Sequence, residues 1–114
     1  MEENLIELLQ TLGYKAYRQG SIPENQAYPD TFFTFWNNET IEHSAFDNDT
    51  SIITYDYDVN VYSTDISVCV TLLEQARTLL KQNNWIITVI SNDMASDEIT
   101  HVGKGMRVLF LRQL

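Results

Sequence analysis

The chain has 114 residues, of which 44% are hydrophobic and 11% aromatic, and this is enough for one folded domain with a modest core. Its 16 acidic and 7 basic residues give a formal net charge of −9, which argues against binding nucleic acid through its phosphates. The single cysteine excludes an internal disulfide. Because the sequence contains no run of about 18 apolar residues, it predicts no membrane-spanning segment. We expect one acidic domain over residues 1–114.

The N-terminal half of the sequence predicts one helix followed by two strands. Leucines repeat at helical spacing over residues 2–12, and Gly13 follows as a common helix stop. A short strand is expected over 14–19, and after a loop that holds both prolines, the aromatic and threonine residues of 31–36 predict a second strand. Residues 37–49 are polar and turn-prone, which indicates a long excursion between strands.

The C-terminal half predicts three more strands and a second helix. Residues 51–62 alternate apolar and polar side chains and form the clearest strand pattern in the chain. Thr64 or Asp65 can cap a helix whose apolar stripe includes Cys69 and several leucines. The remaining elements are a strand over 85–91, an acidic loop over 92–104 and a strand over 106–113.

This order, α-β-β-β-α-β-β, predicts an α+β sandwich in which two helices pack on one face of an antiparallel sheet. Strands 31–36 and 85–90 carry large apolar residues on both faces, so something must also cover the second face. We expect that cover to be another copy of the chain; the alternative is that the long loop folds over these strands. The candidate interface residues are Phe32, Trp36, Phe46, Ile86 and Ile90.

One short segment has the spacing of a metal site. Asp56, Asp58 and Asn60 match the first half of a calcium-binding loop. Val61 then stands where that loop requires glycine, and Ser67 stands where it requires a bidentate glutamate. Residues two apart in a strand share a face, so the sequence predicts the solvated face of a strand rather than a metal site.

The other residues that often carry chemistry also have structural interpretations. Cys69 lies on the apolar stripe of the second helix, where a small buried side chain is expected. His43 and His101 lie in separate predicted loops. Gly103-Lys104-Gly105 is too short for a phosphate-binding loop and predicts a flexible turn before the last strand. The sequence therefore predicts no catalytic residue, no cofactor and no metal, and the chain is not expected to be an enzyme.

Two longer segments, "YPDTFFTFW" and "ITYDYDVNVYS", together with the order of elements, resemble the tail-completion (tail-terminator) proteins of long-tailed bacteriophages and prophages. The resemblance covers essentially the whole chain. One departure is Gly103-Lys104-Gly105, which precedes the final strand where the family has an aromatic-rich approach. The matching residues are Pro29, Phe33, Thr34, Phe35, Tyr57, Val59, Val61, Tyr62 and Ser63.

The resemblance implies a structural protein that forms a ring, commonly a hexamer, at the head-proximal end of the tail tube. Its partners would be other copies of itself, the tail tube protein and the head-completion or connector protein. DNA would pass through the ring without specific binding, and no membrane would be involved. The protein would reside in the host cytoplasm during assembly and then in the tail or neck of the virion. The candidate acidic residues of the lumen or partner face are Asp47, Asp49, Asp56, Asp58, Asp97 and Glu98.

Two other classes of protein stay open at this point. A small acidic secretion-type chaperone, which binds a partner polypeptide as a dimer, has nearly the same element order and charge. A ferredoxin-like sensor of small molecules is a third interpretation, although Ser63-Thr64-Asp65 predicts only a helix cap. The ring number, the sheet face that lines the lumen, and the choice between tail terminator and neighbouring head-completion protein are also open.

Overall fold

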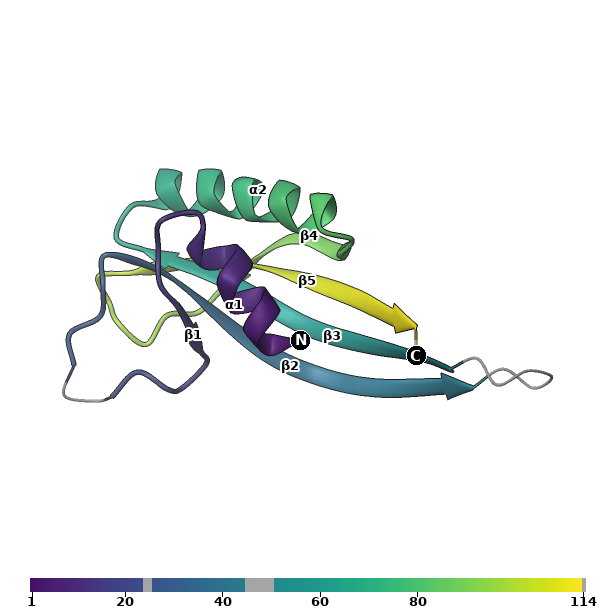
Figure 1. The fold of residues 1–114 in the computed structure, drawn as a ribbon. Coiled ribbons are helices and arrows are strands. Elements are labelled where there is room, and N and C mark those ends of the chain that lie inside the picture. The colour runs from purple at the N-terminus through teal and green to yellow at the C-terminus, as the bar shows by residue number, and fades with distance from the viewer. Residues whose placement is uncertain (24–25, 45–50, 114) are drawn as a thin grey trace.

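The computed structural model describes residues 1–23, 26–44 and 51–113. Two helices and five strands follow one another in the order α-β-β-β-α-β-β, which confirms the predicted α+β class (Figure 1). The elements are α1 (Glu2–Gln10), β1 (Ala16–Arg18), β2 (Thr31–Ser44), β3 (Ser51–Ser63), α2 (Ile66–Gln82), β4 (Ile86–Met94) and β5 (Val102–Gln113).

The five strands form one sheet in the order β1-β2-β3-β5-β4. The pairs β2–β3, β3–β5 and β5–β4 are antiparallel, whereas β1 runs parallel to β2 and pairs Ala16 with Phe33. The sheet is therefore mixed, not wholly antiparallel as the sequence predicted. β1 and β2 are parallel because the proline-containing loop between them carries the chain back to the starting end of β1. A tight hairpin would have made the two strands antiparallel.

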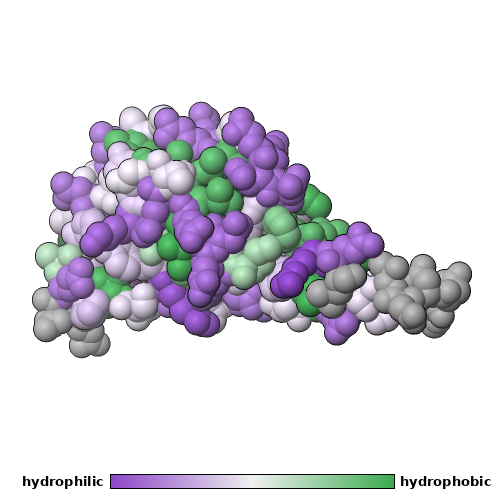
Figure 2. Space-filling model, viewed as in Figure 1, coloured by the Kyte–Doolittle hydropathy of each residue, from purple (hydrophilic) through white to green (hydrophobic). Residues whose placement is uncertain are grey.

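Both helices pack on one face of the sheet, as predicted, and the core lies between these two layers. Asp65 caps the N-terminus of α2, and its carboxylate accepts a hydrogen bond of 2.9 Å from the Ser67 N–H. Cys69 is fully buried in the core, in agreement with its place on the helical stripe. Hydrophilic side chains cover much of the outward side of α2, and apolar side chains reach the surface between the helices and the strands (Figure 2).

The segment 37–44 is a strand, so the prediction of a long polar excursion from residue 37 was wrong there; the rest of that segment, residues 45–50, lies outside the described residues. β2 continues to Ser44 and pairs with β3 as far as Ser51. A bulge between Asn37 and Glu39 interrupts this pairing, and the Asn37 side-chain amide donates to the carbonyl oxygens of Glu39 and Asp56, both at 3.3 Å. The polar residues therefore belong to a long hairpin, whose strands extend past the helices (Figure 1).

The second predicted loop is also shorter than expected. β4 continues to Met94 and β5 begins at Val102, so the connection comprises residues 95–101 rather than 92–104. Gly103 and Gly105 lie inside β5, opposite Tyr62 and Asn60 of β3, and the prediction of a flexible turn there was wrong. A Cβ atom on Gly105 would approach Asn60 Oδ1 to 2.3 Å, so glycine is needed to make room for the neighbouring side chain.

Candidate functional site

The sheet face away from the helices, here called the outer face, carries five of the eight predicted site residues that the structure describes. The alternation of the strands defines it, because Phe33, Val59 and Val108 point into the core beneath the helices. Directly opposed residues of neighbouring strands share a face, so the register places Phe32 beside Tyr62, and Asp58 between Trp36 and Arg107. The outer face has three zones that differ in chemistry.

The first zone is covered by the chain itself. Phe32, a predicted interface residue, is only 2% exposed. Its ring stacks on Tyr62 at 5.5 Å and meets Tyr28 edge-on at 5.5 Å, and His101 lies over it at 5.8 Å. The loop before β2 and the loop 95–101 therefore shield Phe32 from solvent. The other described interface candidates, Trp36, Ile86 and Ile90, are exposed. The sequence left open that the long polar loop after residue 36 covers the second sheet face. At this end of the sheet, two other loops provide the cover.

The second zone contains an ion pair between the buried carboxylate of Asp56 and the half-exposed side chain of Arg107. Asp56 is 5% exposed, so the prediction that it belongs to a solvated acidic face was wrong. Arg107 donates from Nε and Nη2 to the two carboxylate oxygens, at 2.9 and 2.6 Å, and Asn38 donates to Oδ1 at 3.2 Å. The hydrogen bonds from Arg107 hold the pKa of Asp56 below its ordinary value of 3.8, although burial opposes this shift. The charge of Asp56 is therefore compensated within the chain.

Two further polar residues beside this pair are also buried. Asn60 is 1% exposed and donates from Nδ2 to Thr34 Oγ1 at 3.3 Å. The expectation of a solvated strand face therefore fails at Asn60 as it does at Asp56. Asp58 is partly exposed and accepts a hydrogen bond of 3.0 Å from Asn38. The polar side chains in the middle of the outer face thus bond mainly to one another.

The third zone is apolar and open to solvent. We call it the aliphatic stripe: it runs diagonally across the outer face through Ile41, Ile52, Leu111, Leu109 and Ile86. Ile41 and Leu111 flank Thr54 from the two neighbouring strands, and Ile52 lies two residues before Thr54 on the same face. Leu109 lies opposite Ile86. Ile86 and Leu111 are 49% and 47% exposed, and Trp36 nearby is 47% exposed. Apolar side chains gathered in this way on a single face indicate an interaction surface.

The edge strand β4 departs from simple alternation. Its pairing with β5 shifts between Ile87 and Val89 and again between Val89 and Asn92. The first shift brings Val89 opposite Arg107, so Val89 does not share the core-facing side of Ile87 as the sequence suggested. Ile90 is exposed and lies in the second irregularity, where its carbonyl oxygen accepts a hydrogen bond of 3.3 Å from Arg77 of α2.

The other predicted site residues do not gather in one place. Asp97 and Glu98 are exposed in the loop 95–101, next to the shielded end of the outer face, whereas Asp58 lies at its middle. Three predicted site residues, Phe46, Asp47 and Asp49, lie outside the described residues. The predicted acidic surface is therefore divided between two regions, and Asp56 does not contribute a free charge to it.

Sequence reasoning missed most of the aliphatic stripe and the partner of Asp56. The run Val108-Leu109-Phe110-Leu111 has the same two-faced apolar pattern as strands 31–36 and 85–90, and this signal was available for β5. Arg107 lies 51 residues from Asp56, and only the register of β3 on β5 brings them together. Residues 38–44, which extend the pairing of β2 with β3, are mostly polar, so their sequence showed no comparable apolar pattern.

Metal-binding groups do not gather within the described ranges, since no three His, Cys, Asp or Glu side chains there lie close enough to hold an ion. Burial raises the pKa of the Cys69 thiol. Neither helix in the described part of the chain is long and apolar enough to cross a membrane. The sequence matches no protein-family model, and a search of curated proteins found no match.

Proposed function

We propose that this protein is a structural subunit of a bacteriophage or prophage tail, a tail-completion (tail-terminator) protein whose ring ends the tail tube and joins it to the head connector. The matched segments around Pro29–Phe35 and Tyr57–Ser63 support this proposal, as does an element order that agrees with the one the resemblance implies. The observation that carries it is the exposed aliphatic stripe on the outer face. An isolated subunit leaves this surface in water, and a neighbouring copy would cover it.

The stripe favours a closed ring over an isolated chain. The two helices lie on the opposite face, so they do not cover Ile86 or Leu111. If the stripe of one copy meets a different surface of the next, the contact is heterologous, and repetition of that contact closes into a ring when the rotation permits. The resemblance implies six copies.

The charge distribution supports passage of DNA without binding. Each chain carries a net charge of −9, and a ring would multiply this charge around its channel. Since Arg107 compensates Asp56, the free acidic groups among the described candidates are Asp58, Asp97 and Glu98. The exposed ends of the subunit, namely the long β2–β3 hairpin and the loop 95–101, are the surfaces that we assign to the tail tube and connector proteins.

The test is a double variant, Ile86→Ser with Leu111→Ser, compared with Ile99→Ser. Ile99 is fully exposed in the loop 95–101, away from the stripe, and it controls for the general loss of an apolar side chain. We expect the double variant to lose self-association in sedimentation velocity because the contact loses its apolar centre. The control should associate like the wild type. The wild type, the double variant and the control should show nearly equal melting temperatures, since substitutions at the surface rarely shift the free energy of unfolding by more than about 0.5 kcal/mol.

A functional readout separates ring formation from the role in the tail. Introduced into the phage or prophage that encodes the chain, the double variant should leave tails that are irregular in length and unattached to heads, as seen by electron microscopy. Particles with the Ile99→Ser control should be normal. If the double variant assembled and supported normal particles, the stripe would not be the ring contact. If it failed to associate but tails remained normal, the tail-terminator role would be wrong.

A further inference from the structure

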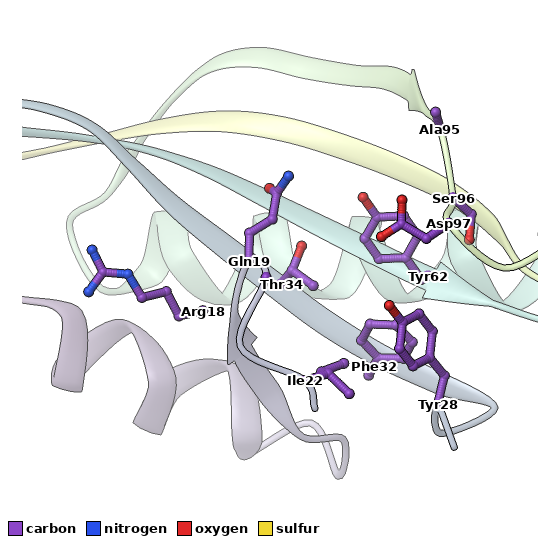
Figure 3. Close-up of a pocket in the computed structure, with 11 residues that line it drawn as sticks. Arg18, Gln19, Ile22, Tyr28, Phe32, Thr34, Tyr62, Ala95, Ser96 and Asp97 are labelled. Carbon is purple, nitrogen blue, oxygen red and sulfur yellow. The ribbon is translucent and has the colours of Figure 1, made fainter. Parts of the chain in front are cut away.

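A small pocket opens at the shielded end of the outer face, and neither the ring contact nor the tail role explains it. Its volume is about 100 Å³. Figure 3 shows the aromatic rings of Phe32, Tyr28 and Tyr62 on one side and Gln19 and Ile22 on the other. Its size is well below the several hundred Å³ of most small-molecule sites. It therefore suits a single compact head group rather than a nucleotide or a sugar chain.

The pocket is held in shape by a contact between two loops that are distant in the sequence. His101 lies at the end of the loop 95–101, and its Nε2–H donates to the Pro29 carbonyl oxygen at 2.8 Å. Its Nδ1 accepts a hydrogen bond of 2.9 Å from the Thr100 hydroxyl. The imidazole also packs against Tyr28 and Phe32, at 6.1 and 5.8 Å between ring centroids. This contact holds the loop 95–101, which carries Asp97, against the segment that carries Tyr28 before any ligand arrives, which lowers the entropy cost of binding.

The chemistry of the lining favours a positively charged ligand. The faces of aromatic rings attract cations, and three such rings line one side of the pocket. Figure 3 shows the Asp97 carboxylate beside Tyr62. Burial, and then the negative charge of Asp97, raise the pKa of Tyr62, so its phenol stays protonated and neutral at pH 7.

The one cationic residue of the lining is directed elsewhere. Arg18 extends away from the aromatic side of the pocket in Figure 3, and its guanidinium lies 3.9 Å from the Glu2 carboxylate. The pocket is therefore lined by a carboxylate, aromatic rings and hydroxyl groups. An anionic ligand would meet Asp97 and the net charge of −9 of the chain.

We propose that this pocket binds an organic cation, the ammonium or guanidinium group of an alkyl chain, with the cation against the rings of Tyr28 and Tyr62 and its charge paired with Asp97. Such a group has two sources, the lysine or arginine side chain of a protein partner and a free alkylamine. Asp97 lies in the loop 95–101 that we assign to a tail partner, but the proposal rests on the chemistry of the pocket and not on the tail role, because cation binding is measured on the chain by itself.

The test is a titration of the full chain with tetramethylammonium, followed by nuclear magnetic resonance. We expect saturable shifts in the signals of Tyr28, Tyr62 and Asp97, and a ring-current shift of the ligand methyl groups. Asp97→Asn should weaken binding by at least about threefold, because the exposed carboxylate contributes a modest but direct attraction. Glu98→Gln, which removes the neighbouring exposed carboxylate outside the lining, should bind like the wild type.

Two further arms identify the source of the cation and exclude simple apolar binding. Nα-acetyl-lysine methylamide and the arginine equivalent test a side chain carried by a protein, and methylammonium and guanidinium test the free ions. Binding of the blocked amino acids at least as tight as that of the free ions supports a protein partner, and binding of the free ions alone supports a free amine. The proposal is overturned if no cation gives a saturable shift, if neutral neopentyl alcohol binds as well as tetramethylammonium, or if Asp97→Asn and Glu98→Gln behave alike.

Discussion

Arg107→Met is expected to lower the melting temperature by about 5–10 °C, because it leaves the buried Asp56 carboxylate without its main partner. The Asp56 carboxylate accepts three hydrogen bonds from Arg107, and only the one from Asn38 would remain. The matched control is Lys104→Met, which removes a positive charge from the same strand. Lys104 pairs with the highly exposed Asp93, so its loss should change the melting temperature by less than about 2 °C.

The dependence on pH gives this prediction a second, independent readout. The pKa of Asp56 lies below 3.8 in the folded chain, so its stabilising effect is complete above about pH 4 and is lost as the pH falls through the lowered pKa. In the Arg107→Met variant the Asp56 carboxylate lacks its main partner. Protonation in acid neutralises this carboxylate and so removes the cost of its unpaired charge. The difference in melting temperature between wild type and Arg107→Met should therefore narrow in acid. Equal effects of Arg107→Met and Lys104→Met at pH 7 would show that the ion pair between Asp56 and Arg107 contributes nothing specific to stability.

Gly105→Ala is expected to cost about 1–3 kcal/mol of unfolding free energy, because the new methyl group overpacks the outer face. Its Cβ would lie 2.3 Å from Asn60 Oδ1, and the next nearest atoms, in Met94 and Asn92, also belong to side chains. Removal of the Asn60 side chain should therefore relieve most of the clash. In the Asn60→Ala background, the further cost of Gly105→Ala should fall well below its cost in the wild type, as measured by chemical denaturation.

Gly103 provides the matched comparison. A Cβ there would meet the Tyr62 ring at 2.7 Å and also the backbone oxygen of Met94 at 2.9 Å. Because a backbone atom cannot swing away, Tyr62→Ala should rescue Gly103→Ala less than Asn60→Ala rescues Gly105→Ala. If Gly105→Ala were neutral in the wild-type background, the close packing of β5 against the Asn60 side chain would be contradicted.

The sequence predicted the elements whose signal is local. The leucine repeat of α1 and the stripe of α2 have helical spacing, and the residues 51–62 alternate clearly, so these elements and the buried Cys69 were found. The polar segment 37–44 was missed because its strand depends on pairing with β3 rather than on its own composition. Gly103 and Gly105 resemble a turn in isolation and become strand residues only beside Tyr62 and Asn60.

The candidate site depended more strongly on contacts between distant residues. Alternation placed Asp56 on the outer face correctly but could not show that Arg107 buries and neutralises it there. Phe32 and Trp36 carry the same signal in the sequence, yet the loops around Tyr28 and His101 shield only Phe32. The bulges of β4 likewise changed which residues share a face. Register, bulges and loop positions are properties of the whole sheet, and a single strand pattern does not encode them.

The central claim, that this chain is a ring subunit, is tested most directly by the mass of the wild-type assembly. Size-exclusion chromatography with light scattering would measure that mass over a range of protein and salt concentrations. We expect a closed assembly of about six 13.2 kDa chains, favoured by higher salt because salt screens the repulsion between acidic subunits. A tight dimer at every concentration would contradict the ring and favour a chaperone-type protein. A monomer under all conditions would contradict any self-contact through the aliphatic stripe.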